Sequence, residues 1–325
     1  MIHAAVIGTG SCLPKRVLSN RDLEKIVETS DEWITSRTGI QTRRIASSDE
    51  KTHQLAVESA KRALDMAGVQ ADELDLIVVA TVSPEMIMPS CACLVQNELG
   101  ASNAFAYDIN AACSGFLYGL DLVDKYIGAR PDMKVLLIGA ERLSARVNWS
   151  DRNTCILFGD GAGACVLTGK DDGRGIIDSN LFSDGSLWSL LYMNGPQNLG
   201  PELKHAEKQD CYIRMMGRDV FKYAVRAMEE AVVDLMLRHD KSVDDLKLVI
   251  PHQANIRILN KLMGRLGLPE DKVFINVSKY GNTSAASIPI ALDEANRSGR
   301  LAPDDLLLFC SFGGGFTWGS MLMHW

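Results

Sequence analysis

The stretch Phe105-Ala-Tyr-Asp-Ile-Asn-Ala-Ala-Cys-Ser-Gly-Phe-Leu-Tyr-Gly-Leu120 joins a strand pattern to a helix pattern. Its first part is typical of a β-strand and the apolar run after Cys113 is typical of a buried helix, with only Asn110-Ala-Ala112 between them. This spacing predicts Cys113 at a helix start, where free backbone N–H groups and the helix dipole favour a thiolate. A cysteine among small and apolar residues is also a common core filler, so the other segments must decide between the two roles.

Composition indicates an ordinary globular protein. The 325 residues are 46% hydrophobic and 23% charged, enough for one large core or two fused ones. The longest apolar runs, such as Leu76-Ile-Val-Val-Ala80, are strand-sized, which predicts no membrane-spanning segment. The N-terminal residues show no pattern of a secretory signal, so we expect a cytoplasmic protein. A net charge of −7 argues against general nucleic-acid binding.

Eight cysteines are scattered through apolar contexts, which favours reduced thiols over a disulfide framework. Cys91 and Cys93 form the one close pair. They have no histidine or second pair nearby, so we expect packing residues and no metal site.

A short helix is predicted after Ser30, which can cap it, and Gly39 can end it. Trp33 and Arg37 are then i and i+4 neighbours on one face. Such a pair can stack on a ligand base, although a surface cation–π pair without a ligand is the commoner outcome.

The second half of the chain repeats the order of elements in the first half, at a spacing of about 170 residues. The matched pairs are 55–63 with 223–231, 77–78 with 249–250, 99–100 with 266–267, and 135–137 with 306–308. Residues 159–215, between them, carry no long periodic run. We therefore predict an α/β protein of two homologous halves, 1–170 with the cysteine and 171–325, forming one compact unit.

Three strand ends of the second half are polar or glycine-rich. Under the repeat, the strand before Cys113 matches a predicted strand 273–277, which leads into Ser278–Ser284. Two further strands end at Pro251–Asn255 and at Ser311–Gly315. Because α/β halves bind ligands at the carboxyl ends of their strands, we expect these segments to gather near Cys113.

His252, Asn282 and the Gly313–Gly315 run are the candidate partners of the cysteine. Each also has an ordinary explanation: a packed histidine, an asparagine favoured in a turn, and a glycine bend. Their functional interpretation is that side-chain and backbone N–H groups stabilise an oxyanion beside a cysteine thioester. Together they indicate acyl transfer.

Four motifs in this order resemble the signatures of 3-oxoacyl-(acyl-carrier-protein) synthase III, in the thiolase fold superfamily. They are Asn-Ala-Ala-Cys113-Ser-Gly-Phe, Pro-His252-Gln-Ala-Asn, Tyr-Gly-Asn282-Thr-Ser and Phe-Gly-Gly-Gly-Phe-Thr-Trp-Gly319. The resemblance covers essentially the whole chain and implies a layered αβαβα core. It also implies an acyl-CoA that loads the cysteine and a decarboxylating condensation with malonyl-(acyl-carrier-protein), which initiates fatty acid synthesis without a cofactor.

By the same resemblance, Cys113 carries the acyl group, Gly314 and the Cys113 backbone bind the oxyanion, and His252 and Asn282 hold the enolate. Met88 would line the acyl pocket across a homodimer interface. The residues implied in coenzyme A binding are Trp33, Arg37, Thr38, Arg152, Gly217, Phe221 and Asn255.

The acyl carrier protein is acidic in this family, and this chain is acidic too, so a local basic patch is expected. Arg257, Lys261 and Arg265 follow His252 at i, i+4 and i+8 of one predicted helix. Such stripes are often only solvated surface. This one adjoins the predicted site and is our candidate docking surface.

Other functions remain open at this point. Cys113, His252 and Asn282 also occur in papain-like order, which allows a cysteine hydrolase, although a papain-like flank around the cysteine is absent. A non-catalytic acyl-CoA-binding relative is a second alternative, although such a relative is expected to lack the cysteine. Relatives of the same fold make quinolones, polyketides or ketones, and the sequence does not fix the primer chain length.

Overall fold

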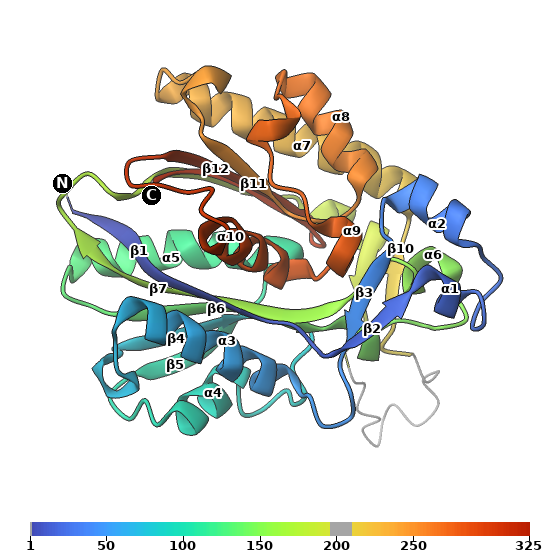
Figure 1. Ribbon diagram of the computed structural model, residues 1–325, viewed down its shortest axis with the longest axis horizontal. Helices are drawn as coiled ribbons and strands as arrows, with labels where there is room; N and C mark the ends of the chain where they lie inside the picture. Colours follow the sequence, from blue (N-terminus) through green and yellow to red (C-terminus); the bar gives the residue numbers. More distant parts are fainter. Residues whose placement is uncertain (1, 196–209) are drawn as a thin grey trace.

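The computed structural model describes residues 2–195 and 210–325, and these form five layers of alternating helices and sheets (Figure 1). Helices α3 and α4 cover the outer face of one sheet, α7 and α8 cover the outer face of the other, and α5 and α10 lie between the sheets (Figure 1). The layered αβαβα core expected from the sequence is therefore confirmed.

The first sheet has the strand order β1-β7-β6-β4-β5. Strands β6, β4 and β5 are parallel to one another, and β7 pairs antiparallel with both β6 and β1. The bounds are β1 His3–Cys12, β4 Leu76–Ala80, β5 Phe105–Ile109, β6 Val135–Arg142 and β7 Asp160–Lys170.

The second sheet has the order β11-β12-β13-β8, in which β11 and β12 are parallel and the other pairs antiparallel. Its strands are β8 Gly175–Ser183, β11 Leu248–Pro251, β12 Leu306–Gly313 and β13 Thr317–His324. All first-sheet strands lie within residues 3–170 and all second-sheet strands within 175–324, so we propose 1–170 and 171–325 as the two repeat units.

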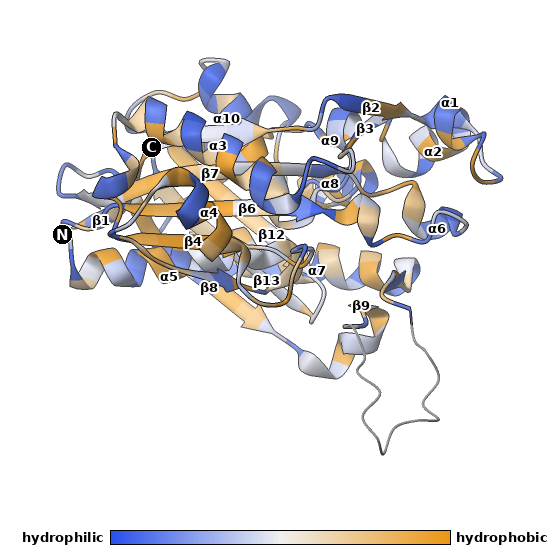
Figure 2. Cartoon of the chain, turned by 90° about the horizontal axis from the view of Figure 1, so that it is seen from below, coloured by the Kyte–Doolittle hydropathy of each residue, from blue (hydrophilic) through white to orange (hydrophobic). Residues whose placement is uncertain are grey.

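The helices that cover the sheets are amphipathic, with apolar residues toward the sheets and polar residues outward (Figure 2). They are α3 Thr52–Ala67, α4 Cys91–Leu99, α5 Gly115–Ala129, α7 Gly217–Arg238, α8 Ile256–Leu266 and α10 Ser287–Arg297. The central pair, α5 and α10, is buried on more sides, and its apolar residues share one core with both sheets. None of the helices within 2–195 and 210–325 has the length and apolar character needed to cross a bilayer.

Shorter elements gather beside the carboxyl ends of the parallel strands (Figure 1). They are β2 Arg16–Ser19, α1 Asn20–Leu23, α2 Asp31–Thr38, β3 Thr42–Ile45, α6 Arg152–Cys155, β9 Leu191–Met193, β10 Ile213–Met215 and α9 Val277–Tyr280. The predicted capping of α2 is confirmed, since the Ser30 hydroxyl accepts from the Trp33 N–H at 3.1 Å and Gly39 ends the helix with φ 75°.

One expectation about local structure was wrong. The segment predicted as strand 273–277 makes only one bridge, between Val249 and Val273. The side chain of Gln253 replaces the missing ladder: its amide oxygen accepts from the N–H groups of Asn276 and Val277, and its amide nitrogen donates to Phe274 O at 3.0 Å. The stretch without long periodicity, 159–215, contains β7 and β8, two of the longest strands. Buried glycines and alanines in β7 hide the hydrophobic alternation there.

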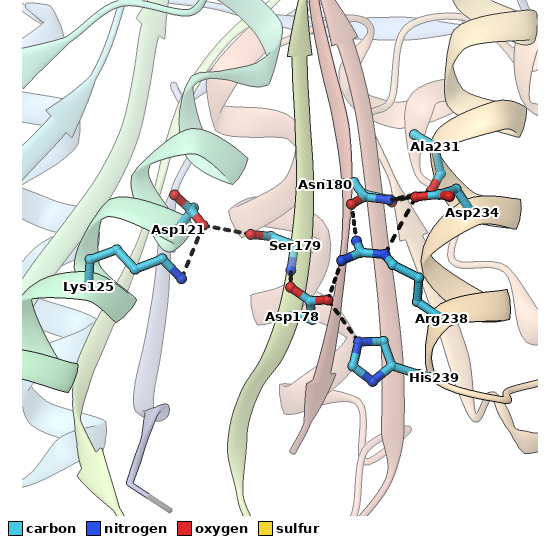
Figure 3. A network of polar contacts seen from close by, with 10 residues as sticks. Asp121, Lys125, Asp178, Ser179, Asn180, Ala231, Asp234, Arg238 and His239 are labelled. Atoms are coloured by element: carbon cyan, nitrogen blue, oxygen red, sulfur yellow. Dashed lines mark hydrogen bonds and ion pairs between the residues drawn. The ribbon is translucent and has the colours of Figure 1, made fainter.

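A polar network fastens the central helix α5 to β8 and α7 (Figure 3). Asp121 of α5 accepts from the Ser179 hydroxyl at 2.6 Å. Asp178, which precedes Ser179 in β8, pairs with Arg238 at the end of α7 and with the following residue His239, each at 2.8 Å. Cys113 lies two residues before α5, so the bond between Asp121 and Ser179 helps to fix the helix that follows the thiol.

Candidate active site

One cavity of about 500 Å³ opens beside the exposed Arg37 and extends to the buried His252 and Asn282. Its volume is within the range of small-molecule sites. The structure brings ten of the residues expected at the site into this lining: Trp33, Arg37, Thr38, Cys113, Gly217, Phe221, His252, Asn255, Asn282 and Gly314.

Cys113 lies in the 3-10 turn Ala112–Ser114, which leads directly into α5. Ala112 has φ 46°, a left-handed conformation that is uncommon outside glycine. The start of β13 holds this turn in place: the Thr317 hydroxyl donates to Ala111 O at 2.8 Å, and the Ser114 hydroxyl donates to Thr317 O at 3.0 Å. The sulfur is thus held in place at the cavity wall by contacts from the other half of the chain.

Burial of Cys113 opposes the thiolate that its position at a helix start is expected to favour. Burial raises the pKa of the Cys113 thiol to about 12, against the lowering effect of a hydrogen bond with Ser284. The side chain lines the cavity and is partly buried, so its charged form loses solvation. Proton removal must therefore accompany attack on the substrate.

Gly313 and Gly314 lie against the cysteine turn. A Cβ atom added to Gly313 would lie 2.6 Å from the Cys113 backbone nitrogen, and one added to Gly314 would lie 3.8 Å from the Ala112 Cβ. The absence of side chains lets the end of β12 approach the turn closely, as an oxyanion site requires.

Gly313→Ala is expected to destabilise the fold by about 1–3 kcal/mol, because the new methyl group overlaps the cysteine turn. A displacement of the sulfur by about 1 Å can slow acylation by about 100-fold. Urea unfolding and the single-turnover rate of acyl-enzyme formation measure the two effects. Gly128→Ala in α5 is the matched control, since no atom lies within 4 Å of its added Cβ. Equal behaviour of the two variants would contradict the close approach.

His252 follows β11 and is a neutral hydrogen-bonding group. It is 4% exposed, and burial lowers its pKa to about 3. Its Nδ1 lies 2.6 Å from the Ser287 hydroxyl, which also accepts from the Gln253 N–H at 3.4 Å. When the Ser287 hydroxyl donates to Nδ1, the ring proton lies on Nε2, which leaves Nε2 as the donor for a ligand.

Asn282 is oriented by its own turn. Its Oδ1 accepts from the Ser284 N–H at 2.8 Å, and its backbone N–H donates to Leu157 O at 2.8 Å. With the carboxamide oxygen occupied in this way, the Nδ2 donor is the atom left for the cavity. His252 and Asn282 are therefore both neutral donors.

The outer part of the cavity is formed by α2, α6 and the start of α8. The guanidinium of Arg152 lies 4.9 Å from the Trp33 ring centroid and that of Arg37 lies 5.8 Å from it. Asn255 caps α8 and donates through Nδ2 to Arg37 O at 3.3 Å. The Thr38 hydroxyl is used within the protein, since it donates to Ile34 O at 2.7 Å.

Five expected residues do not line this cavity. Arg152 contacts it only through Trp33. Met88 is 85% exposed in the loop between β4 and α4. Arg257, Lys261 and Arg265 are exposed on α8, and Arg265 is paired with Glu229.

Sequence reasoning missed Glu141, Ser284, Ser287 and the apolar wall. Ser284 stood within a quoted motif, and Ser287 lies one turn later. Glu141 was visible as a single acid at the end of an apolar strand pattern, a position that indicates burial. The unpredicted apolar wall includes Ile156, Leu191, Met193, Met215, Val220 and Ala224.

Comparison with known proteins agrees with this geometry. Family models described as 3-oxoacyl-[acyl-carrier-protein (ACP)] synthase III and its C-terminal part match residues 107–185 and 236–325. The chain is 56% identical over 324 residues to beta-ketoacyl-[acyl-carrier-protein] synthase III of Desulfotalea psychrophila, covering 100% of both chains.

Solved structures give the same result. A 3-oxoacyl-[acyl-carrier-protein] synthase III from Aquifex aeolicus superimposes with a TM-score of 0.92 at 49% identity, covering 99% of this chain and 100% of that one. The priming beta-ketosynthase of the R1128 polyketide pathway has the same TM-score at 34% identity, covering 99% and 96%.

A cysteine-centred cavity in this layered fold defines the class of thiolase-fold acyltransferases. Within that class, the 56% sequence identity to the Desulfotalea psychrophila enzyme over the full length of both chains shows the family of this chain. The chain belongs to the 3-oxoacyl-(acyl-carrier-protein) synthase III family.

Proposed function

We propose that this protein transfers an acyl group from acyl-CoA to Cys113 and condenses it with malonyl-(acyl-carrier-protein). The products are carbon dioxide and 3-oxoacyl-(acyl-carrier-protein), the first step of fatty acid synthesis. One observation carries the proposal: a single cavity joins Cys113 to two neutral donors, His252 and Asn282, with Trp33 and Arg37 at its outer end.

The loading step needs an attacking sulfur and donors for the tetrahedral oxyanion. Cys113 supplies the sulfur, and its backbone N–H together with that of Gly314 are the candidate donors. Transfer then leaves the acyl group as a thioester on the cavity wall, beside the apolar side chains of β9, β10 and α7.

The condensing step needs stabilisation of an enolate. Loss of carbon dioxide places negative charge on the malonyl thioester oxygen, and Nε2 of His252 and Nδ2 of Asn282 are the two donors proposed to hold it. Decarboxylation itself creates the carbanion, so no strong general base and no bound cofactor are expected. If no cofactor is bound, activity should persist after exhaustive dialysis against a chelator.

A panel of acyl-CoA species with malonyl-(acyl-carrier-protein) tests the function directly. The expected result is an acyl mass on Cys113 followed by a 3-oxoacyl product. Hydrolysis of acyl-CoA without a new carbon–carbon bond would instead support a cysteine hydrolase. The family match does not favour that alternative or a polyketide synthase, since the R1128 polyketide enzyme is only 34% identical to this chain, against 56% for the Desulfotalea psychrophila synthase. The same panel defines the primer length.

We propose that coenzyme A binds at the outer end of the cavity. Its adenine would stack between Trp33 and Arg152, with Arg37 near the phosphates and the pantetheine passing Thr38, Gly217, Phe221 and Asn255. The Arg152 guanidinium now lies 4.9 Å from the Trp33 ring centroid, so Arg152 must move away from the ring for the adenine to enter between them.

Charge reversal on α8 is expected to weaken use of the carrier protein. Arg257→Glu and Lys261→Glu place negative charge where an acidic partner would dock, so the KM for malonyl-(acyl-carrier-protein) should rise about 10-fold, the effect of about 1.4 kcal/mol. Loading from acyl-CoA should stay unchanged. Arg265 should contribute less, because Glu229 already pairs with it.

Lys247→Glu is the control, since Lys247 is exposed and precedes β11, whereas His252 follows that strand. Steady-state kinetics with carrier protein and single-turnover loading separate the two steps. Equal loss of both steps in the α8 variants would refute docking there.

We further propose a homodimer in which Met88 enters the partner's acyl pocket. Met86, Ile87 and Met88 are 42%, 77% and 85% exposed, an unusual run of apolar side chains on a surface. Met88→Asp is expected to raise the dimer dissociation constant and to change the preferred acyl length, measured by light scattering and by the acyl-CoA panel. Leu237→Asp, at a 74% exposed leucine of α7, should change neither. A monomeric wild-type protein would contradict the proposal.

The expected cytoplasmic location stays a prediction. The eight cysteines are all free thiols, which fits a reducing compartment.

A further inference from the structure

Ser287 is a buried hydroxyl in direct contact with His252. It is the first residue of α10 and is 2% exposed. Its oxygen lies 2.6 Å from Nδ1 of His252, a distance typical of hydrogen bonds that involve a hydroxyl. Ser287 is outside the cavity lining, so it reaches a bound substrate only through His252.

The direction of this hydrogen bond follows from the other contact of Ser287. Its oxygen accepts from the backbone N–H of Gln253 at 3.4 Å. Across residues 2–195 and 210–325, no carbonyl or carboxylate oxygen is in position to accept the Ser287 proton. A buried hydroxyl without an acceptor for its proton is costly, so the proton is placed toward Nδ1 of His252. Nδ1 is then an acceptor, and the neutral ring carries its proton on Nε2.

Gln253 holds the backbone N–H beside Ser287 in place. Its residue is 1% exposed, and its amide nitrogen donates to Pro251 O at 2.9 Å and to Phe274 O at 3.0 Å. Its amide oxygen accepts from the backbone N–H groups of residues 276–277 at 3.0 and 3.2 Å. These four hydrogen bonds fix the peptide that follows the histidine.

No charged group sets the proton of His252 in another way. None of the ion pairs of histidines in the described residues includes it, because those pairs belong to His53 and His239. A neutral imidazole has two tautomers, and the hydrogen bond at one nitrogen decides which nitrogen carries the proton. The contact with Ser287 is therefore the one that selects the tautomer.

One short segment, 284–287, orients both donors proposed to hold the enolate. The Ser284 N–H donates to Oδ1 of Asn282 at 2.8 Å, and the Ser287 hydroxyl contacts Nδ1 of His252. In each case the acceptor atom of the side chain is occupied by this segment. The donor atom, Nδ2 or Nε2, is the one left for the cavity.

We propose that Ser287 is a positioning residue for the condensing step. Its hydroxyl holds His252 in the tautomer with the proton on Nε2, where the enolate oxygen accepts it as a hydrogen bond. This inference rests on the function proposed above and adds a residue to it.

The fixed tautomer also limits the second substrate. With its proton on Nε2 and with Nδ1 occupied by Ser287, the His252 ring has no lone pair for a proton from a substrate carbon. The enolate must then arise when a carbon–carbon bond breaks: carbon dioxide leaves, and the electron pair of that bond becomes the enolate. Ser287 thereby selects a carboxylated thioester over an acetyl thioester as the second substrate.

The tautomer is measured by ¹⁵N NMR of the full-length protein labelled in its histidine rings. The His252 resonances are identified by their loss in His252→Ala. In the wild type at neutral pH they should show a proton on Nε2 and none on Nδ1. In Ser287→Ala the Nδ1 resonance should shift, because Nδ1 no longer accepts a hydrogen bond. A wild-type ring protonated on Nδ1, or an unchanged Nδ1 resonance in Ser287→Ala, would overturn the proposal.

The kinetics of Ser287→Ala separate the two half-reactions. Release of carbon dioxide from malonyl-(acyl-carrier-protein) should fall about 10- to 100-fold, the range found when partners that orient metal-binding histidines are removed. The loss should be in kcat and not in KM, because Ser287 does not line the cavity. Single-turnover loading of Cys113 should keep its wild-type rate. A folded Ser287→Ala protein with the wild-type rate of decarboxylation would refute the positioning role, and equal loss of both steps would show a purely structural one.

Ser59→Ala is the matched control. Ser59 is a 0% exposed serine of α3 whose hydroxyl donates to Ala56 O at 2.8 Å. Its replacement also removes a buried helix hydroxyl, and it should change neither the His252 resonances nor either half-reaction. Loss of condensation alone in Ser59→Ala would contradict a role specific to Ser287.

The wild-type spectrum decides the proposal even if Ser287→Ala does not fold, since it reports the tautomer without a substitution at Ser287. It also separates this inference from the function on which it rests. Failure of the wild type to load Cys113 or to release carbon dioxide would reject the proposed function, whereas a proton on Nδ1 in an active wild type would reject only the role of Ser287.

Discussion

Cys113→Ser is expected to reduce acyl-enzyme formation to background. A serine hydroxyl is a much weaker nucleophile than a thiolate and needs a strong adjacent base. His252 is a neutral donor engaged with Ser287, and the carboxyl of Glu141 is fully buried. Intact-protein mass spectrometry after incubation with acyl-CoA measures the loss, and condensation should disappear with it.

Cys93→Ser is the control for this prediction. Cys93 is a partly buried thiol of α4 whose sulfur contacts Ala106 O at 3.8 Å, so its replacement should leave loading intact. An acyl mass on the Cys113→Ser protein, or on another cysteine of the wild type, would contradict the assignment of the nucleophile.

The protonation state of Cys113 could not be predicted from the sequence. Its position before an apolar helix was predictable from residues 105–120, and the structure confirms it. The helix dipole is a local effect, whereas desolvation depends on segments more than 100 residues away, such as those of Ser284 and Gly313. Only the assembled site shows how far burial raises the pKa of the Cys113 thiol.

The layered fold was predictable because its halves repeat. Amphipathic periodicity identified α3 and α7, and apolar runs identified β4 with β11 and β6 with β12. The strand predicted at 273–277 does not form, for a reason that no sequence pattern indicates. Its backbone groups are satisfied by the side chain of Gln253, a residue that sequence reasoning treated only as part of a motif.

The residues of the candidate site that follow the ends of strands were predictable from the sequence. His252 follows β11, and Asn282 and Gly314 lie in turns rich in glycine, all outside the periodic segments. Glu141 and Ser287 instead lie inside apolar or small-residue elements, where a single polar residue gives a weak signal. Their partners, Ser83 and His252, are distant in the sequence, so the contacts emerge only from the fold.

His252→Ala and Asn282→Ala are expected to separate the two half-reactions. Each should keep loading of Cys113 and lose malonyl decarboxylation by about 100- to 1,000-fold, the usual cost of removing one oxyanion donor. Asn282→Asp should be at least as severe, because it places an acceptor where the enolate needs a donor. Release of carbon dioxide from malonyl-(acyl-carrier-protein) and acyl mass on Cys113 measure the two steps.

The pH dependence sharpens this prediction. Burial lowers the pKa of His252 to about 3, so the ring is a neutral donor from about pH 5 to 9 and condensation should show no inflection from it. A catalytic imidazolium would instead lose activity as pH rises through its pKa. His239→Ala, at a half-buried histidine that pairs with Asp178, should leave both steps unchanged. Normal condensation by both alanine variants would exclude the enolate role of His252 and Asn282.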